Sequence, residues 1–336
     1  MQIYGKEVPK MSSSKLAVGI VGLPNVGKST LFNALLKKQQ AYVANFPFAT
    51  IEPNIGVVPV PDERLQKLAE IYNAPIVPAT VEFIDIAGII AGASKGEGLG
   101  NKFLSHIREV DAICHVVRAF GDTDIVREGS TDPKNDFEII KTELELADLD
   151  TVERHKQKKN ANVEELQLLA KKPMLVVLNV DESDLKKAGE LEEKYASEFG
   201  LEKNQVIAIC AKTEAELAGL SEEDQVVYLN ELGQTKSGLE RLINKAFSTL
   251  GLMTFLTAGE KEVRAWTLRL GETSLRASGV IHTDFMKNFI KADICSFADF
   301  IEFGGWKKCR ELGKVRSEGR DYIMQDGDVV EFKIGI

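Results

Sequence analysis

Residues 22–29 of this chain read GLPNVGKS, which follows the pattern G-x-x-x-x-G-K-S. An apolar run over residues 16–21 precedes this pattern and predicts a buried strand, and residues 30–36 follow it with the apolar spacing of a helix. A strand, a glycine-rich loop and a helix in this order form the context in which the pattern binds phosphate. The stretch therefore predicts an α/β fold with a nucleoside triphosphate site.

The residue types in this loop suggest individual roles. Backbone N–H groups of the loop and of the helix N-terminus would surround the phosphates. Lys28 would reach the β- and γ-phosphate oxygens, and Ser29 would hold Mg²⁺, the expected cofactor. The phosphate-binding residues are thus predicted to be Asn25, Val26, Gly27, Lys28, Ser29 and Thr30.

Length and composition are those of an ordinary globular protein with room for two domains: 336 residues, 44% hydrophobic and 28% charged. No apolar run approaches the length of about 20 residues that a membrane-spanning helix needs. Residues 1–14 lack the apolar core of a signal peptide. The four cysteines, at positions 114, 210, 295 and 309, have no metal-ligand spacing. These features predict a flexible leader over residues 1–14 and a cytoplasmic protein with free thiols.

The net charge of −9 argues against indiscriminate nucleic-acid binding, but it is unevenly spread. Residues 251–336 contain 13 Lys or Arg and 13 Asp or Glu, so the whole excess of negative charge lies in residues 1–250. Within the neutral part a basic cluster fits either a solvated helix face or a contact with RNA phosphates. Its members are Lys307, Lys308, Arg310, Lys314, Arg316 and Arg320.

Apolar strand candidates alternate with helical segments over residues 15–250, which predicts a doubly wound, mostly parallel sheet. Residues 55–60 are expected to form an edge strand, because Pro59 cannot donate a ladder hydrogen bond. After residue 250 the pattern changes to short strand candidates at 262–270, 279–281 and 328–334 among short helical pieces. We therefore expect a P-loop domain over residues 15–250 and a small α+β domain over residues 251–336.

Two further motifs fit a nucleotide-dependent switch. Thr50 lies 21 residues after Ser29, where such a protein supplies a second hydroxyl to Mg²⁺. Asp85 and Gly88 form D-x-x-G at the end of a predicted strand. The carboxylate would steady Mg²⁺ through water, and the glycine N–H would meet the γ-phosphate. Lys28, Asp85 and Gly88 are therefore candidate catalytic residues.

The base-selecting segment is expected at residues 179–182, which read NVDE at the end of another predicted strand. Guanine-specific proteins carry N-K-x-D here, and the aspartate accepts hydrogen bonds from both donors of guanine. Val180 replaces the lysine and Glu182 the aspartate, and the longer side chain would misplace the paired hydrogen bond, at a cost of about 1–3 kcal/mol. This difference weakens GTP specificity and admits ATP. The predicted base contacts are Asn179, Val180 and Glu182, with Cys210, Ala211 and Lys212 on the other side of the base.

The residue that orients the attacking water is not evident. Ile89 stands where Ras-like proteins carry a glutamine, so we expect slow intrinsic hydrolysis. His115 lies within a buried strand candidate and is expected to be a core histidine with satisfied hydrogen bonds. His106 is expected to lie on the surface.

Seven segments resemble the YchF-type Obg-like ATPases: residues 19–35, 45–65, 82–88, 92–118, 255–267, 279–285 and 319–332. The later segments, such as GRDYIMQDGDVVEF at 319–332, are peculiar to that subfamily. The resemblance implies a G-domain with a helical coiled-coil insertion and a C-terminal TGS domain of β-grasp fold. It also implies hydrolysis of ATP, often in preference to GTP. The implied partner is the ribosome, through its large subunit, or RNA bound by the TGS domain. No association with a membrane is expected.

The chain departs from the family pattern at two places. The helical insertion, which falls within residues 119–172, looks tens of residues shorter than usual between Val152 and Lys172. Arg127 stands where family members carry a histidine proposed to assist hydrolysis. An arginine there could stabilise charge on the γ-phosphate, but it could not act as a base at neutral pH.

Three functions fit the sequence. The first is a Mg²⁺-dependent ATPase whose switch segments, near residues 45–54 and 87–100, order around the γ-phosphate and report that state to a ribosome. The second is a ribosome-binding module whose binding ignores the nucleotide. The third is a GTP-specific switch. A metabolite kinase is the least favoured, because no motif for a separate small-molecule pocket accompanies the loop.

Overall fold

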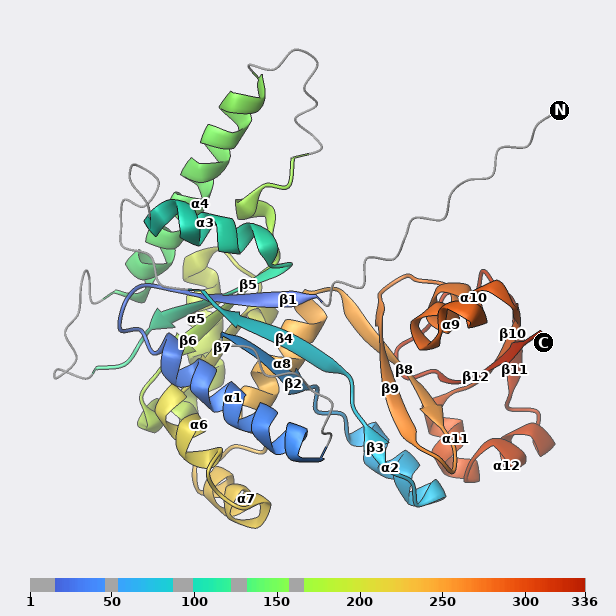
Figure 1. Ribbon diagram of the computed structural model, residues 1–336. Coiled ribbons are helices and arrows are strands. Elements are labelled where there is room, and N and C mark those ends of the chain that lie inside the picture. The colour runs from blue at the N-terminus through green and yellow to red at the C-terminus, as the bar shows by residue number, and fades with distance from the viewer. Residues whose placement is uncertain (1–15, 46–53, 87–98, 122–131, 157–165, 336) are drawn as a thin grey trace.

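Two six-stranded sheets form the frame of the protein (Figure 1). The computed structural model describes residues 16–45, 54–86, 99–121, 132–156 and 166–335. The predicted leader over residues 1–14 lies outside these ranges. No helix within them is both long and apolar enough to cross a membrane. All four cysteines are free and buried, as the lack of metal-ligand spacing predicted.

The first sheet has the strand order β2-β4-β1-β5-β6-β7. Every neighbouring pair is parallel except β2 and β4, so the predicted doubly wound, mostly parallel sheet is confirmed. The central strands β1 and β5 are buried along their whole length, and Pro59 ends the edge strand β2 as expected. The strands span β1 (Ala17–Val21), β2 (Ile55–Pro59), β4 (Thr80–Asp85), β5 (Ala112–Arg118), β6 (Met174–Asn179) and β7 (Val206–Ile209).

Helices cover both faces of this sheet. Figure 1 shows α3 and α4 on one side and α1 and α6 on the other. The longest helix is α4, whose far end projects away from the sheet, and Asp148 on it accepts hydrogen bonds from the N–H groups of Leu169 and Ala170 on the returning chain. The helices span α1 (Lys28–Asn45), α2 (Glu63–Tyr72), α3 (Leu99–Glu109), α4 (Pro133–Lys156), α5 (Ala188–Phe199), α6 (Ala211–Leu217), α7 (Glu222–Glu231) and α8 (Gly238–Thr249).

The second sheet has the order β11-β10-β12-β8-β9-β3 and carries short helices, which confirms a small α+β unit after residue 250. Its strands are β3 (Ile76–Val77), β8 (Leu252–Ala258), β9 (Val263–Arg269), β10 (Phe289–Cys295), β11 (Arg316–Glu318) and β12 (Val329–Ile334). Its helices are α9 (Ser274–Ile281), α10 (Thr283–Lys287), α11 (Phe297–Phe303) and α12 (Trp306–Glu311).

The predicted strand at residues 279–281 is wrong, because these residues form the last turn of α9. Thr273 caps this helix by accepting a hydrogen bond from the N–H of Arg276. Gly279 permits close packing of α10, since a Cβ there would lie 3.2 Å from the Sδ atom of Met286. The cap and this contact outweigh the strand propensity of the Val-Ile pair.

One strand of the second sheet comes from the N-terminal half of the chain. Ile76 and Val77 form β3 and pair in parallel with Val263 and Arg264 of β9. Helix α2, just before β3, contacts β8, β9 and α11. No sequence pattern predicts this pairing, because β3 has only two residues and its partner strand lies almost 200 residues further along the chain. The division of domains at residue 251 remains a prediction, and residues 63–77 lie against the second sheet.

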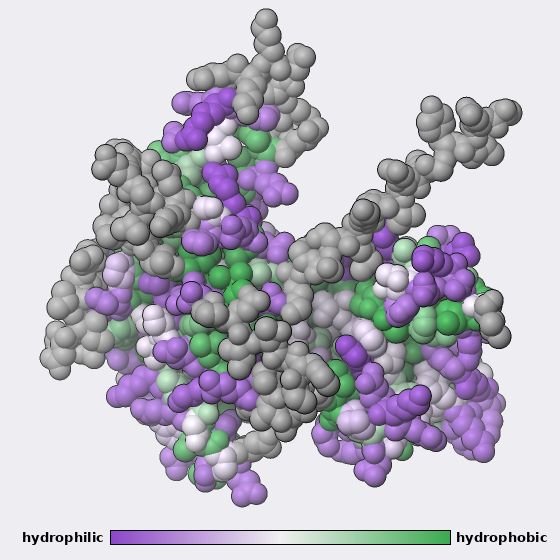
Figure 2. All heavy atoms as spheres, in the orientation of Figure 1, coloured by the Kyte–Doolittle hydropathy of each residue, from purple (hydrophilic) through white to green (hydrophobic). Residues whose placement is uncertain are grey.

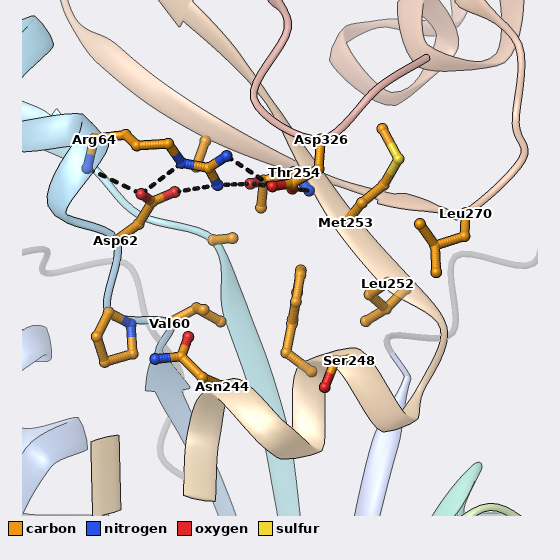
Figure 3. Close-up of a pocket in the computed structure, with 14 residues that line it drawn as sticks. Val60, Asp62, Arg64, Asn244, Ser248, Leu252, Met253, Thr254, Leu270 and Asp326 are labelled. Atoms are coloured by element: carbon orange, nitrogen blue, oxygen red, sulfur yellow. Dashed lines mark hydrogen bonds and ion pairs between the residues drawn. The ribbon is translucent and has the colours of Figure 1, made fainter. Parts of the chain in front are cut away.

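An arginine at the start of α2 ties the two sheets together (Figure 3). The guanidinium of Arg64 donates to both carboxylate oxygens of Asp62, to the hydroxyl of Thr254 on β8 and to Asp326 before β12, at 2.7–2.8 Å. These groups form one wall of a cavity of about 300 Å³, and Asn244 of α8 lies on its opposite wall. The junction is therefore held by a polar network as well as by apolar contact.

Replacement of Arg64 with methionine is expected to lower the free energy of unfolding by about 1–3 kcal/mol, because two carboxylates lose their shared partner. Urea denaturation measures this loss. Lys203→Met is the matched control, because Lys203 and Glu193 form an exposed ion pair for which we expect less than about 1 kcal/mol. Equal losses in the two variants would contradict the assigned role of Arg64.

Candidate nucleotide-binding site

The phosphate-binding loop connects β1 to α1, as the sequence predicted. Asn25 and Gly27 have positive φ values of 59° and 98°, and α1 begins at Lys28. A Cβ at position 27 would lie 2.2 Å from the side-chain nitrogen of Asn179. Glycine is therefore required at this position both by its backbone conformation and by the closeness of its neighbour.

Asn179 joins the three segments that the sequence assigned to the site. Its side-chain Nδ2 donates to the carbonyl of Val26, and its Oδ1 accepts from the N–H of Ala211, both at 2.9 Å. The side chain is buried, so these hydrogen bonds hold the phosphate loop, the end of β6 and the start of α6 in one arrangement. The asparagine thus has a structural role in addition to any contact with the base.

A cavity of about 750 Å³ opens beside this asparagine. Most of the predicted residues line it: Asn25, Gly27, Lys28, Ser29, Thr30, Asn179, Val180, Glu182, Cys210, Ala211 and Lys212. Val26 lies behind the wall, buried, with its carbonyl bound to Asn179. Thr50, Gly88, Ile89 and Arg127 lie outside the described residues. Asp181, inside the predicted segment 179–182 but given no role there, also lines it, and no sequence pattern indicated four further lining residues: Phe120, Thr213, Glu216 and Tyr228.

Lys28 lines the phosphate end of the cavity, and the half-buried carboxylate of Asp85, at the end of β4, interacts with it electrostatically from outside the cavity lining. Lys28 is buried and its ammonium donates to the carbonyl of Leu23 at 2.6 Å. Burial lowers the pKa of Lys28, and the charge of Asp85 opposes that shift. Burial likewise raises the pKa of Asp85, against the effect of Lys28. Each group therefore favours the charged form of the other, as a site for phosphate and a cation requires.

The donors near Lys28 fit a Mg²⁺ ion that arrives with a nucleotide. Ser29 is exposed on the first turn of α1 and lines the cavity, and Asp85 ends β4. Hydroxyl and carboxylate oxygens are the hard ligands that Mg²⁺ prefers. The described part of the chain contains no group of three or more His, Cys, Asp or Glu residues that could hold a metal ion.

The base end of the cavity is built around Glu182. Its Oε2 atom accepts hydrogen bonds from the hydroxyls of Thr213 on α6 and Tyr228 on α7, both at 2.9 Å. The hydrogen bond to Glu182 raises the pKa of Tyr228 to about 12. Neighbouring Asp181 accepts from the N–H of Gly121. No sequence motif announces Tyr228, which lies 46 residues after Glu182, so only the folded chain brings the two together.

Comparison with known proteins identifies the family. Residues 17–180 match the sequence profile described as a 50S ribosome-binding GTPase. Residues 252–335 match the profile of the YchF-GTPase C-terminal family, described as a protein of unknown function. The ribosome-binding ATPase YchF of Bacillus subtilis (strain 168) is 46% identical over 96% of this chain and 100% of its own length. The chain belongs to the YchF family.

Other YchF proteins give the same result. The ribosome-binding ATPase YchF of Haemophilus influenzae is 47% identical over 95% of this chain and 99% of its own. The solved structure of the YchF GTPase of Schizosaccharomyces pombe superposes with a TM-score of 0.82 at 35% identity, over 95% of this chain and 98% of that one. The fold of the YchF family, a P-loop G-domain followed by a sheet-containing C-terminal unit, is therefore the fold of this chain.

This YchF-family chain is shorter than the relatives it matches. The alignment with the Bacillus subtilis protein extends over 365 residues, whereas this chain has 336, so the relative carries tens of residues with no counterpart here. The total length does not locate the difference. A shortened insertion between Val152 and Lys172 therefore stays a prediction for this YchF protein.

Phe120 places an aromatic ring on the wall of the nucleotide cavity, just after β5. The guanidinium of Arg118 lies 4.3 Å from the centre of this ring. If the ring stacks on the base, Phe120→Ala should weaken nucleotide binding about tenfold, since such stacking contributes about 1–3 kcal/mol. Titration with a fluorescent nucleotide measures the change. Phe303→Ala removes a half-buried ring remote from the cavity and is expected to leave the affinity unchanged; a similar loss in both variants would rule out stacking.

His115 is a core residue, as predicted, but the expectation that its nitrogens are hydrogen-bonded is wrong. The side chain is fully buried on β5, and neither Nδ1 nor Nε2 has a hydrogen-bond partner among the residues that the structure describes. Its ring stacks on Phe137 with 5.7 Å between centroids. His106, in contrast, lies exposed on α3 beside Glu109 and does not line the nucleotide cavity. The prediction of a surface residue at position 106 is confirmed.

Burial lowers the pKa of His115 to about 3, whereas a histidine in the unfolded chain has a pKa of about 6.5. Between these values only the unfolded state takes up the proton, so stability falls as the pH decreases below about 6.5. The loss should reach about 2 kcal/mol at pH 5. His115→Leu should remove this part of the acid sensitivity. Denaturation of both proteins at pH 7.5 and pH 5 tests this, and parallel losses would contradict it.

Proposed function

We propose that this protein is a Mg²⁺-dependent nucleoside triphosphatase that hydrolyses ATP, accepts GTP less readily and binds the ribosome. The observation that carries the choice of ATP is the presence of Glu182 and buried Val180 at the base end of a P-loop cavity. Guanine specificity in this position relies on an aspartate with a lysine beside the base. The relatives of Bacillus subtilis and Haemophilus influenzae are called ribosome-binding ATPases, which supports both halves of the proposal, whereas the relative of Schizosaccharomyces pombe is called a GTPase.

The residues at the phosphate end of the cavity would have different roles in hydrolysis. Lys28 would bind the β- and γ-phosphate oxygens, and the backbone N–H groups at the start of α1 would donate hydrogen bonds to the phosphates. Bound Mg²⁺ would offset phosphate charge, held by Ser29 and Thr50 directly and by Asp85 through water. We further propose that Gly88 contacts the γ-phosphate and that Arg127 stabilises its charge. Slow intrinsic hydrolysis is expected, because Ile89 cannot orient water.

The contact with the ribosome is proposed to involve the C-terminal unit as a TGS domain, and the large ribosomal subunit, as the description of the matched G-domain profile suggests. A cytoplasmic location would follow. The basic cluster gives weak support to direct RNA binding, since most of its charges are paired. Lys308, Arg310, Lys314 and Arg316 form ion pairs with Glu311, Glu331, Asp299 and Glu318 respectively.

Three measurements test the proposal. Competition of ATP and GTP for one labelled nucleotide gives the base preference, and a strong preference for GTP would replace the proposed ATPase with a GTP-specific switch. Hydrolysis rates with and without ribosomes, together with co-sedimentation in ATP, ADP and no nucleotide, test the second half. Identical pelleting in all three states would leave a ribosome-binding module that ignores its nucleotide.

A further inference from the structure

The carboxylate of Glu182 is only half available to a base. Thr213 and Tyr228 both donate to the same oxygen, Oε2, at 2.9 Å. A carboxylate oxygen has two acceptor positions, and two hydroxyl donors fill both. Oε1 is then the oxygen of Glu182 that can accept a hydrogen bond from a ligand.

The hydroxyls of Thr213 and Tyr228 come from two helices, α6 and α7, and contacts within the protein hold each helix in place. Thr213 is buried on α6, and the next residue, Glu214, accepts from the N–H groups of Gly238 and Leu239 at the start of α8. Tyr228 lies on α7, whose first turn is capped by Ser221. The helices that carry both donors are therefore fixed by packing and capping contacts within the protein.

The hydrogen-bonding edges of the two purines differ in what they need from this carboxylate. Guanine presents two neighbouring donors, N1–H and the N2 amino group, and pairs best with both oxygens of one carboxylate. Adenine presents a single donor group, the N6 amino group, and one free oxygen satisfies it. A carboxylate with one oxygen occupied leaves a guanine donor unpaired, which costs affinity.

We propose that Thr213 and Tyr228 are specificity-determining residues, which occupy one oxygen of Glu182 and so disfavour guanine. The proposal rests on the proposed function in that the cavity binds a purine nucleotide through Glu182. It assigns the discrimination to the two hydroxyls rather than to the length of the glutamate side chain. The nearby carboxylate of Glu216, 3.5 Å from the Tyr228 hydroxyl, provides a comparison, since it lines the same cavity without this pair of donors.

The test is the ratio of the dissociation constants for fluorescent ATP and GTP derivatives in the full-length protein with Mg²⁺. Tyr228→Phe and Thr213→Val each remove one donor, and the double variant frees Oε2. The double variant is expected to shift the ratio toward GTP by about threefold to tenfold, and each single variant by less. Thr213→Ser keeps the hydroxyl and should keep the wild-type ratio, as should Tyr195→Phe, which lies on α5 outside the cavity.

An unchanged ratio in the double variant, with thermal denaturation like that of the wild type, would overturn the inference. A shift in Glu216→Gln as large as in the double variant would also overturn it, because another carboxylate would then read the base. These outcomes are separable from failure of the proposed function. If the wild-type protein shows no preference for ATP and the double variant still shifts toward GTP, the proposed preference for ATP fails and the two hydroxyls keep their role.

Discussion

Lys28→Met is expected to reduce the rate of ATP hydrolysis by about 10²–10³-fold. The ammonium of Lys28 is buried at the start of α1 and donates to the carbonyl of Leu23 at 2.6 Å, close to where phosphate oxygens would lie. Methionine fills much of the same volume but supplies no charge to the γ-phosphate as it leaves. Single-turnover hydrolysis, with each protein in excess over ATP and well above its dissociation constant, isolates the chemical step from binding.

The control for this experiment is Lys38→Met, which changes the same residue type on the same helix. Lys38 forms an ion pair with Glu240 at 3.3 Å and lies away from the cavity. We expect wild-type hydrolysis from it and a change in stability of at most about 1 kcal/mol. A Lys28→Met protein that is folded and hydrolyses ATP at the wild-type rate would remove the P-loop lysine from the mechanism.

Asn179→Ala is expected to weaken nucleotide binding at least about tenfold and to lower the free energy of unfolding by about 2–4 kcal/mol. Both effects have one cause, because the variant leaves the carbonyl of Val26 and the N–H of Ala211 buried without their partner. The phosphate loop then loses its connection to β6 and α6. Nucleotide titration and urea denaturation of the same preparation measure the two losses together.

Asn230→Ala provides the comparison, because Asn230 is exposed near the end of α7. It is expected to leave the affinity and stability within about 0.5 kcal/mol of the wild type. If Asn179→Ala loses affinity but no stability, the asparagine acts on the base alone, and its assigned role in joining the three segments is wrong.

Local patterns allowed much of the fold and most of the site to be predicted. The glycine loop with its flanking strand and helix, the apolar strands of the first sheet and the residues 179–182 were all readable because each depends on neighbours in sequence. The structure places the predicted loop, Glu182 and residues 210–212 around one cavity. The short segment 279–281 was misread as a strand, because its helix depends on a cap at Thr273 and on packing against α10.

Sequence patterns were thus sufficient for the phosphate loop, the parallel sheet and the family, since regular spacing and short motifs record contacts between near neighbours. Tertiary packing added the pairing of β3 with β9, the Arg64 network, the stacking of buried His115 on Phe137 and the two hydroxyls on Glu182. The pairing, the network and the hydroxyls join residues far apart in the chain, and no periodicity records such contacts. The glycine loop determines where the phosphates bind. We infer that side chains on α6 and α7, far from the loop in sequence, influence which base the bound nucleotide carries.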